Sequence, residues 1–281
     1  MKTLLYGLLA ETSIHPGAGQ SSGFVDLPVA REAATDYPVI VGSSLKGALL
    51  SVARDRGWSD DKRNRVFGKH DNAGGLLVSD ARLLLLPVRS LTSHFMWITC
   101  PHLIERYVRD RRRMESVAPD SIRGLEVLSV EDVNVPKYIG PDIGALFLEE
   151  RQFVRAGGIP DGLTTILKPM MRHSETADRL DKQLVVLSDA SFAWFARYGL
   201  AINARNKLDP NTKTTVKGAL WYEETLPPDS LFYLLLAERN DGALKPIKEL
   251  FAKKPYLQVG GNETVGHGWF AMSAPLEGGQ S

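Results

Sequence analysis

TLLYGLLAETSI, residues Thr3 to Ile14, sets the frame for the fold. Leucines occupy both odd and even positions in this stretch, so both faces of an extended chain would be apolar. The pattern predicts a first β-strand. The strand is followed by HPGAGQSSG, residues His15 to Gly23, whose glycines, proline and serines favour turns.

A long connection and a helix follow the first strand. Residues Phe24 to Gly42 hold two prolines and four charged residues without a sustained period, and such long loops are commonly functional or disordered. The next segment, SSLKGALLSVARDRG, predicts a helix that is capped by Ser43 or Ser44 and ends at Gly57. Its apolar residues recur at helical spacing: Leu45, Ala48, Leu49, Val52 and Ala53.

Strands and helices alternate along the rest of the chain. Further strands are predicted over 76–88, 95–99, 144–156, 182–187, 230–238, 256–259 and 269–272, and helices from Pro101 and over 190–198 and 244–253. A polar stretch with a DPN turn, residues 203–224, predicts a projecting β-hairpin. Together the elements predict a single α+β domain with a ferredoxin-like core, about residues 1–110 and 180–275. An insertion of about 111–180 and a hairpin of about 199–225 would decorate this core.

Composition narrows the classes of function. The chain has 34 Lys and Arg against 33 Asp and Glu, a net charge of +1, which argues against a strongly basic nucleic-acid binder acting alone. Local basic patches remain compatible with that balance. Cys100 is the one cysteine, so an intramolecular disulfide and a cysteine-based metal cluster are excluded, and a reducing compartment, the cytoplasm, is expected. No run approaches the roughly 18 apolar residues of a membrane span, so no membrane association is expected.

Two segments have features that suit the binding of an anion. SSLKG lies at a predicted helix N-terminus, where backbone N–H groups, Ser43, Ser44 and Lys46 could converge on a phosphate. A capped surface helix with a solvated lysine explains the same residues. Between the last two strands, glycines would let a backbone approach closely, although a tight β-turn accounts for them equally well. The residues of interest there are Gly260, Gly261, Gly266, His267 and Gly268.

Carboxylates and a histidine are the candidates for catalysis. His15 and Asp26 flank the first long loop, and a carboxylate near a histidine can hold a divalent cation or accept a proton from a hydroxyl. Turn formation by both residues is the plainer alternative. Glu223 and Glu224 end the predicted hairpin beside two aromatic residues, which could stack on bases or pack in the core.

Five stretches carry a resemblance to a known family. They are HPGAGQSSGFVDLPVAREAATDYPVIVGSSLKGAL, VFGKHDNAGGLLVSDARLLLLPVRSL, MWITCPHLIERY, GALWYEETLP and VGGNETVGHG. The chain resembles the RAMP superfamily and, more narrowly, the repeating backbone subunit of the type III-B (Cmr) CRISPR effector complex. The resemblance extends along nearly the whole chain.

The resemblance implies a modified RNA-recognition-motif core and a thumb formed by the hairpin. Copies would stack head to tail on a guide RNA together with other Cmr subunits, and each thumb would displace one base pair of the guide–target duplex. The target RNA would then be cut at regular intervals, in antiviral defence. Head-to-tail contacts of this kind build open helical arrays, and linked copies gain avidity although each is nearly neutral.

Roles for individual residues also follow from the resemblance. Asp26, in VDLP, would be the catalytic carboxylate, which binds Mg²⁺ or serves as base while the 2′-OH attacks the adjacent phosphate. His15 would position the phosphate or move a proton, with support from Glu223 or Glu224. Guide RNA would be held by Lys46, the adjacent serines and the terminal glycine loop. The family often has a lysine where this chain has His267, and a neutral imidazole would hold a phosphate more weakly.

Two other functions fit the sequence. One is a backbone subunit that binds guide RNA without cutting it, and Asp26 is the one feature of the sequence that argues against this function. The other is a stand-alone endoribonuclease of the same superfamily that processes guide RNA without a metal. An enzyme acting on small molecules is a distant third, because no cofactor motif is present.

Overall fold

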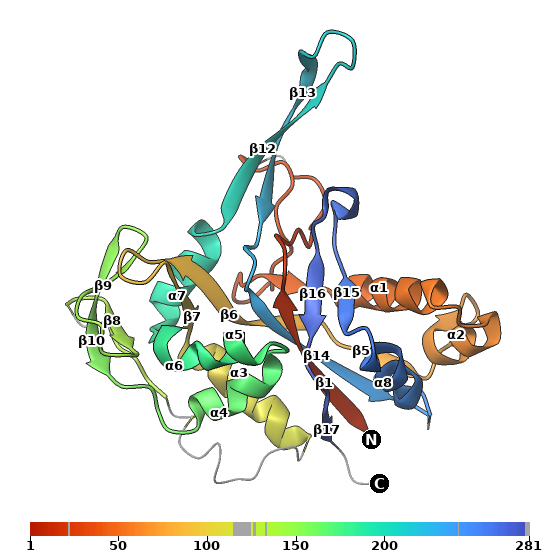
Figure 1. Ribbon diagram of the computed structural model, residues 1–281, viewed down its shortest axis with the longest axis horizontal. Coiled ribbons are helices and arrows are strands. Elements are labelled where there is room, and N and C mark those ends of the chain that lie inside the picture. Colours follow the sequence, from red (N-terminus) through yellow and green to blue (C-terminus); the bar gives the residue numbers. More distant parts are fainter. Residues whose placement is uncertain (22, 115–124, 126–127, 133, 241, 279–281) are drawn as a thin grey trace.

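The computed structural model describes the chain except residues 22, 115–124, 126–127, 133, 241 and 279–281. A large mixed sheet runs through it (Figure 1). Its strands lie in the order β15 (Tyr256–Gln258), β16 (Trp269–Met272), β1 (Thr3–Ala10), β14 (Leu231–Glu238), β6 (Ala81–Arg89), β7 (Phe95–Thr99), β11 (Leu184–Leu187), β8 (Lys137–Ile139), β10 (Arg151–Gly157) and β9 (Leu146–Leu148). Neighbours from β15 to β7 are antiparallel, whereas β7 and β11 are parallel.

Short strands extend this sheet or lie outside it. The strands β17 (Leu276–Gly278), β2 (Val39–Ile40) and β5 (Leu76–Val78) pair with β1, β6 and β14, respectively. Two ribbons are separate: β3 (Gly68–Lys69) with β4 (Asn72–Ala73), and β12 (Ala201–Leu208) with β13 (Thr215–Thr225).

Helices cover both faces of the sheet. The helical elements are α1 (Gly42–Asp55), α2 (Asp60–Phe67), α3 (Pro101–Arg113), α4 (Leu163–Leu167), η3 (Lys168–Met170), α5 (Ser174–Asp178), α6 (Leu180–Gln183), α7 (Asp189–Tyr198), α8 (Leu244–Ala252) and η4 (Glu263–Val265). None of these described helices is long and apolar enough to cross a membrane. The combination of helices with a mixed sheet confirms the predicted α+β class.

The alternation of side chains along β1 explains the two layers of helices. Leu4 and Leu8 point into a cluster with residues of α1 and α8, whereas Leu5 and Leu9 join a second cluster with residues of α3 and α4. Successive residues of a strand face opposite sides of the sheet, so an entirely apolar strand must be covered on both. Both apolar faces of β1 are therefore buried in the core.

The structure corrects several boundaries. The first strand ends at Ala10 because the chain bends there, and Ile14 forms only an isolated bridge with Leu226. The strand predicted over 144–156 is a hairpin of β9 and β10, whose turn places Glu149 in the left-handed region. The short helix α2, which was not predicted, lies between α1 and β3. Part of the predicted insertion of 111–180 lies outside the described residues.

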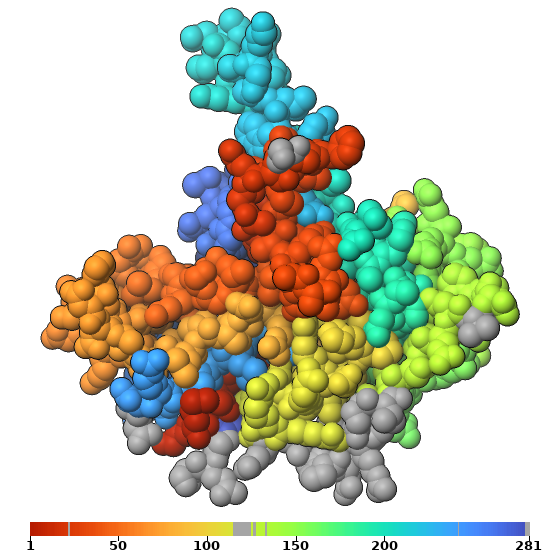
Figure 2. All heavy atoms as spheres, turned by 180° about the vertical axis from the view of Figure 1, so that it is seen from behind, coloured from red at the N-terminus to blue at the C-terminus, as the bar shows by residue number. Residues whose placement is uncertain are grey.

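The β12–β13 hairpin stands away from the rest of the molecule (Figures 1 and 2). Most side chains of β12 are exposed, and β13 becomes buried only over its last residues, Glu223 to Thr225. Figure 2 shows the N-terminal segment packed around the base of this ribbon. The buried base fixes the hairpin to the domain, while its outer part offers two open faces.

Candidate RNA-cleavage site

Three segments distant in sequence meet at the base of the hairpin (Figure 1). They are the N-terminal loop between β1 and β2 (residues 11–38), the end of β13, and the terminal loop between β15 and β16 (residues 259–268). The Leu27 N–H donates to the Tyr222 carbonyl at 3.0 Å, and the Glu224 N–H donates to the Leu27 carbonyl at 3.0 Å. The Gly261 N–H donates to the His15 carbonyl at 3.0 Å. The N-terminal loop is thus bonded along the hairpin on one side and to the terminal loop on the other.

Asp26 is the predicted catalytic residue that lines a pocket. Its Oδ2 accepts a hydrogen bond from the Tyr222 N–H at 2.7 Å. Among the described residues, no donor reaches its other oxygen, Oδ1. The pocket measures about 380 Å³ and joins the N-terminal loop to the hairpin; its other lining residues are Gln20, Ser21, Leu27, Gly218, Leu220 and Trp221. A carboxylate with one oxygen fixed and one available is positioned to accept a proton or contact a cation.

His15 lies in the interior of this junction. Its side chain is buried, and Nδ1 donates to the Glu224 carbonyl at 2.8 Å. A carbonyl oxygen only accepts, so Nδ1 carries a proton in this arrangement. The imidazole lies beside Gly17 and Gly261, which leave room for it because they have no Cβ. These contacts show His15 joining the three segments.

Glu223 and Glu224 are both buried at the end of β13, and their side chains face opposite directions. Glu223 accepts a hydrogen bond from the Asn262 amide at 2.6 Å and lies 3.5 Å from the Arg205 guanidinium. Its neighbour Glu224 faces the N-terminal loop. Their contacts therefore anchor the two loops to the hairpin. Asn262 and Arg205 were not predicted, since no pattern in the sequence links them to Glu223.

Glu224 binds the N-terminal loop through both carboxylate oxygens. Oε2 accepts from the Val29 N–H at 3.0 Å, and Oε1 forms an ion pair with Arg31 at 2.7 Å. Arg31 was not predicted as a site residue, because its partner Glu224 lies 193 residues away in the sequence. Because both oxygens of this buried carboxylate are engaged, Glu224 fixes the N-terminal loop to β13.

The residues predicted to grip guide RNA lie at the start of α1. Ser43 and Ser44 are exposed in its first turn, and Lys46 is partly exposed. The prediction that a serine caps this helix is wrong: the N-cap is Val41, and the Asp80 carboxylate accepts from the Gly42 N–H at 2.7 Å. Part of the positive helix end is therefore already matched by Asp80.

The terminal loop uses glycine where the backbone demands it. Gly260, Gly266 and Gly268 have φ values of +94°, +84° and +85°, a region that favours glycine. Gly260 also packs against the N-terminal loop, since a Cβ there would lie 2.6 Å from the His15 carbonyl oxygen. His267 is partly buried, and its Nδ1 has no hydrogen-bond partner among the described residues.

Alanine at Gly260 should therefore be more damaging than alanine at Gly266. Both changes place a Cβ in the left-handed region, which costs roughly 1–2 kcal/mol. Only Gly260→Ala also forces the loop away from the His15 carbonyl, so we expect a total loss of roughly 2–4 kcal/mol. Thermal unfolding of the two variants measures the difference. Equal melting temperatures would show that the terminal loop does not pack on His15.

Comparisons with known proteins agree along the whole chain. The model of the RAMP superfamily matches residues 8–271. The CRISPR system Cmr endoribonuclease Cmr4 of Pyrococcus furiosus is 33% identical over 291 aligned residues, which cover 97% of this chain and 96% of that protein. The CRISPR system CMR subunit Cmr4 of Saccharolobus solfataricus is 26% identical over 286 residues, with 92% of each covered.

Solved structures show the same similarity. Oligomeric Cmr4 from Pyrococcus furiosus superimposes with a TM-score of 0.75 at 27% identity, over 100% of both chains. A chain of the type III-B Cmr-beta complex bound to cognate target RNA gives a TM-score of 0.77 over 96% of both chains; at 20% identity it shows the fold alone. The chain therefore belongs to the RAMP superfamily, and within it resembles the Cmr4 subunits of CRISPR Cmr systems.

Proposed function

We propose that this protein is the repeating backbone subunit of a type III-B CRISPR effector complex and cleaves target RNA paired to the guide. The observation that carries the proposal is Asp26: a carboxylate at the base of the hairpin, in a pocket, with one oxygen available. The name of the Pyrococcus furiosus relative, an endoribonuclease, supports the same activity. Such a complex works in the cytoplasm.

The core is best described as ferredoxin-like. Strands β16, β1, β14 and β6 are successive antiparallel neighbours, and α1 and α8 pack on one face of them. In chain order these elements read β1, α1, β6, β14, α8, β16, the β-α-β-β-α-β order of that fold. This core and the hairpin form one domain with the predicted insertion.

The β12–β13 hairpin acts as the thumb. Its exposed apolar residues lie on a ribbon with two open faces: Ile202, Leu208, Val216, Leu220 and Tyr222. Apolar and aromatic side chains can fill the space of a displaced base pair. Further copies, other Cmr subunits, guide RNA and single-stranded target RNA are the partners. An oligomeric relative supports assembly of copies, and linked copies raise affinity although each has a net charge of +1.

The guide strand lies along the exposed start of α1 and the terminal loop. Lys46, Ser43 and Ser44 supply donors to its phosphates, and Gly260, Gly261, Gly266 and Gly268 let the backbone approach the strand. His267 contributes less than a lysine would at neutral pH.

The reaction is an in-line attack of a ribose 2′-OH on the adjacent phosphorus. Asp26 accepts the hydroxyl proton, the 2′-oxygen bonds to phosphorus, and the bond to the 5′-oxygen breaks, leaving a cyclic phosphate. The departing 5′-oxygen takes a proton from water. His15, Glu223 and Glu224 position the loop that holds Asp26. For His15, a direct contact with the phosphate or a part in proton movement stays a prediction.

Mg²⁺ fits this site as an ion shared with RNA. Within the described part of the chain there is no group of three or more His, Cys, Asp or Glu side chains that could hold a metal. Mg²⁺ commonly uses one or two carboxylates together with substrate phosphates and water. As the alternative to its role as base, Asp26 would supply the one protein ligand through its available oxygen, and the ion would neutralise charge on the phosphate.

Cleavage should therefore require assembly, target and a divalent ion together. We expect the complex with guide RNA to cut a matched target at regular intervals, and the isolated chain to cut neither target nor guide precursor. Chelation should stop cutting and leave target binding in place. Cleavage of guide precursor by the isolated chain in EDTA would instead support a stand-alone processing enzyme. Binding without cutting at any Mg²⁺ concentration would support a purely structural subunit.

A further inference from the structure

The segment that follows Asp26 is held from two sides. Leu27 forms a bridge with Glu223 of β13, and the Val29 N–H binds the Glu224 carboxylate. Arg31 and Glu32 come next, as adjacent residues of an extended segment, and they contact different elements. Arg31 and Glu32 each form a largely buried ion pair. Buried ion pairs keep a fixed geometry better than exposed pairs do.

Arg31 ties the segment to the hairpin base. Its guanidinium pairs with Glu224 at 2.7 Å, and the two side chains are only 16% and 9% exposed. A second nitrogen of Arg31 donates to the carbonyl oxygens of Asp36 and Ala196, at 2.9 and 2.8 Å. One side chain thus joins β13, the far end of the same loop and α7.

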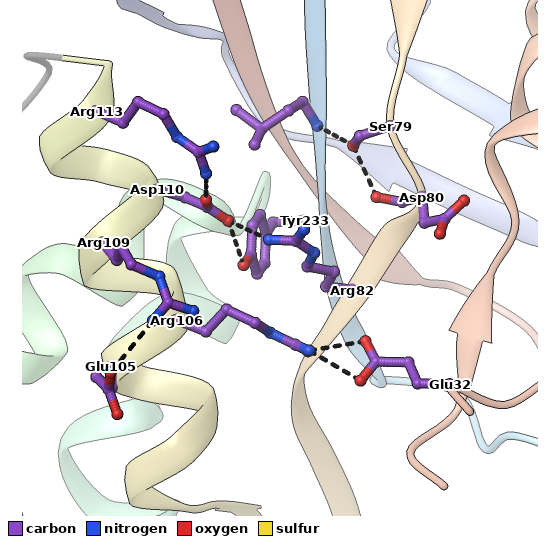
Figure 3. A network of polar contacts seen from close by, with 11 residues as sticks. Glu32, Ser79, Asp80, Arg82, Glu105, Arg106, Arg109, Asp110, Arg113 and Tyr233 are labelled. Atoms are coloured by element: carbon purple, nitrogen blue, oxygen red, sulfur yellow. Dashed lines mark hydrogen bonds and ion pairs between the residues drawn. The ribbon is translucent and has the colours of Figure 1, made fainter. Parts of the chain in front are cut away.

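Glu32 ties the segment to α3 (Figure 3). Both of its oxygens accept from Arg106 Nη1 at 2.8 Å, and this pair is also largely buried, at 18% and 11% exposure. Burial by itself raises the pKa of Glu32, but hydrogen bonds from Arg106 and Thr35 outweigh it and the pKa is lowered. Glu32 is therefore charged at neutral pH.

Arg106 is itself part of a rigid support. One turn further along α3, Asp110 pairs with Arg82 of β6 at 2.6 Å and accepts from the Tyr233 hydroxyl of β14 at 2.8 Å. Figure 3 shows these groups beside one another between α3 and the sheet. The helix that holds Glu32 is thereby fixed to the central strands.

We propose that Arg31 and Glu32 are positioning residues, which clamp the Asp26 loop between the hairpin base and α3 and so set the carboxylate relative to the thumb. The inference rests on the proposed function. Neither residue is proposed to touch RNA. Because the loop is bonded along β13, the thumb and the catalytic carboxylate move as one unit, and loosening either tether lowers cleavage more than target binding.

A spin label can test the clamp without any cleavage. Phe24 is fully exposed in the same loop, so Phe24→Cys offers a labelling site. Cys100 is buried and burial raises the pKa of its thiol, so it should not compete for the reagent. We expect Glu32→Gln and Arg31→Met to narrow the lines of the nitroxide spectrum of the free chain, because the labelled loop would move more freely. Glu105→Gln is the matched control, because it removes an exposed pair with Arg109 on the same helix.

Two further readouts complete the test. Arg106→Glu should narrow the spectrum more strongly, and the exchange Glu32→Arg with Arg106→Glu should restore it in part. In the assembled complex, Glu32→Gln should lower the cleavage rate at saturating target roughly tenfold, with target affinity nearly unchanged. Spectra that match the Glu105→Gln control would overturn the clamp, and so would a mobile loop with undiminished cleavage. The nitroxide spectra of the free chain do not depend on whether Asp26 is catalytic, so the clamp and the proposed function can fail separately.

Discussion

Replacing Asp110 with alanine should lower the free energy of unfolding by about 2–4 kcal/mol, because it removes a buried carboxylate that accepts hydrogen bonds from three side chains. Asp110 is 1% exposed and binds Arg82, Arg113 and the Tyr233 hydroxyl. Burial and the neighbouring carboxylate raise the pKa of Tyr233, which keeps its hydroxyl protonated as a donor. Alanine would leave the buried Tyr233 hydroxyl and the partly buried Arg82 guanidinium, both on the sheet, without this acceptor, and α3 would lose its polar contact with them.

Glu105→Gln provides the control on the same helix. Glu105 pairs with Arg109 at 3.3 Å, but these side chains are 51% and 62% exposed, so the change should cost about 0–1 kcal/mol. Thermal unfolding compares the two variants, with a fall on the order of 10 °C expected for Asp110→Ala. Similar melting temperatures for both would mean that the Asp110 network does not hold α3 to the sheet.

Much of the fold could be predicted because its signals are local. The apolar residues of β1, the helical spacing in α1 and the turn residues of the terminal loop act within a few positions of one another. The α2 helix was missed because DDKRNRVF is almost entirely polar and buries only Val66 and Phe67, which gives no periodic pattern. The cap of α1 was missed because the carboxylate that binds its first N–H comes from Asp80, on another segment.

The candidate site also combines residues that the sequence could predict with contacts that it could not. Asp26 lies in a loop, Phe24 to Gly42, whose length indicated either a function or disorder, and His15 lies in the turn-rich segment just before it. The ion pairs that position this loop could not be predicted, since Glu224 and Arg31 are 193 residues apart, and Glu32 and Arg106 are 74 apart. Any of 34 basic residues could have paired with either glutamate, and only the folded chain selects the partner.

Asp26→Asn should nearly abolish cleavage while the loop keeps its place. The asparagine carbonyl can still accept from the Tyr222 N–H, so the contact that fixes the side chain at 2.7 Å survives. What is lost is the negative charge and the ability to accept a proton. General base catalysis contributes roughly 10²–10⁴-fold, and we expect a loss of that size. Asp26→Ala should be no more active and should also loosen the loop, because it removes the acceptor.

Asp71→Asn is a suitable control, since Asp71 is exposed and pairs only with His70 among the described residues. The control should cleave like the parent complex. Any fall in its activity would mean that the preparation of variants, and not Asp26, limits the rate.

The most direct measurement is the single-turnover cleavage rate of the assembled complex with Asp26→Asn at saturating target, taken together with the target dissociation constant. We expect the rate to fall by at least about a hundredfold and the dissociation constant to stay the same. Cleavage at the parent rate with equal affinity would contradict it, because the carboxylate at the base of the hairpin would then have no part in cutting RNA.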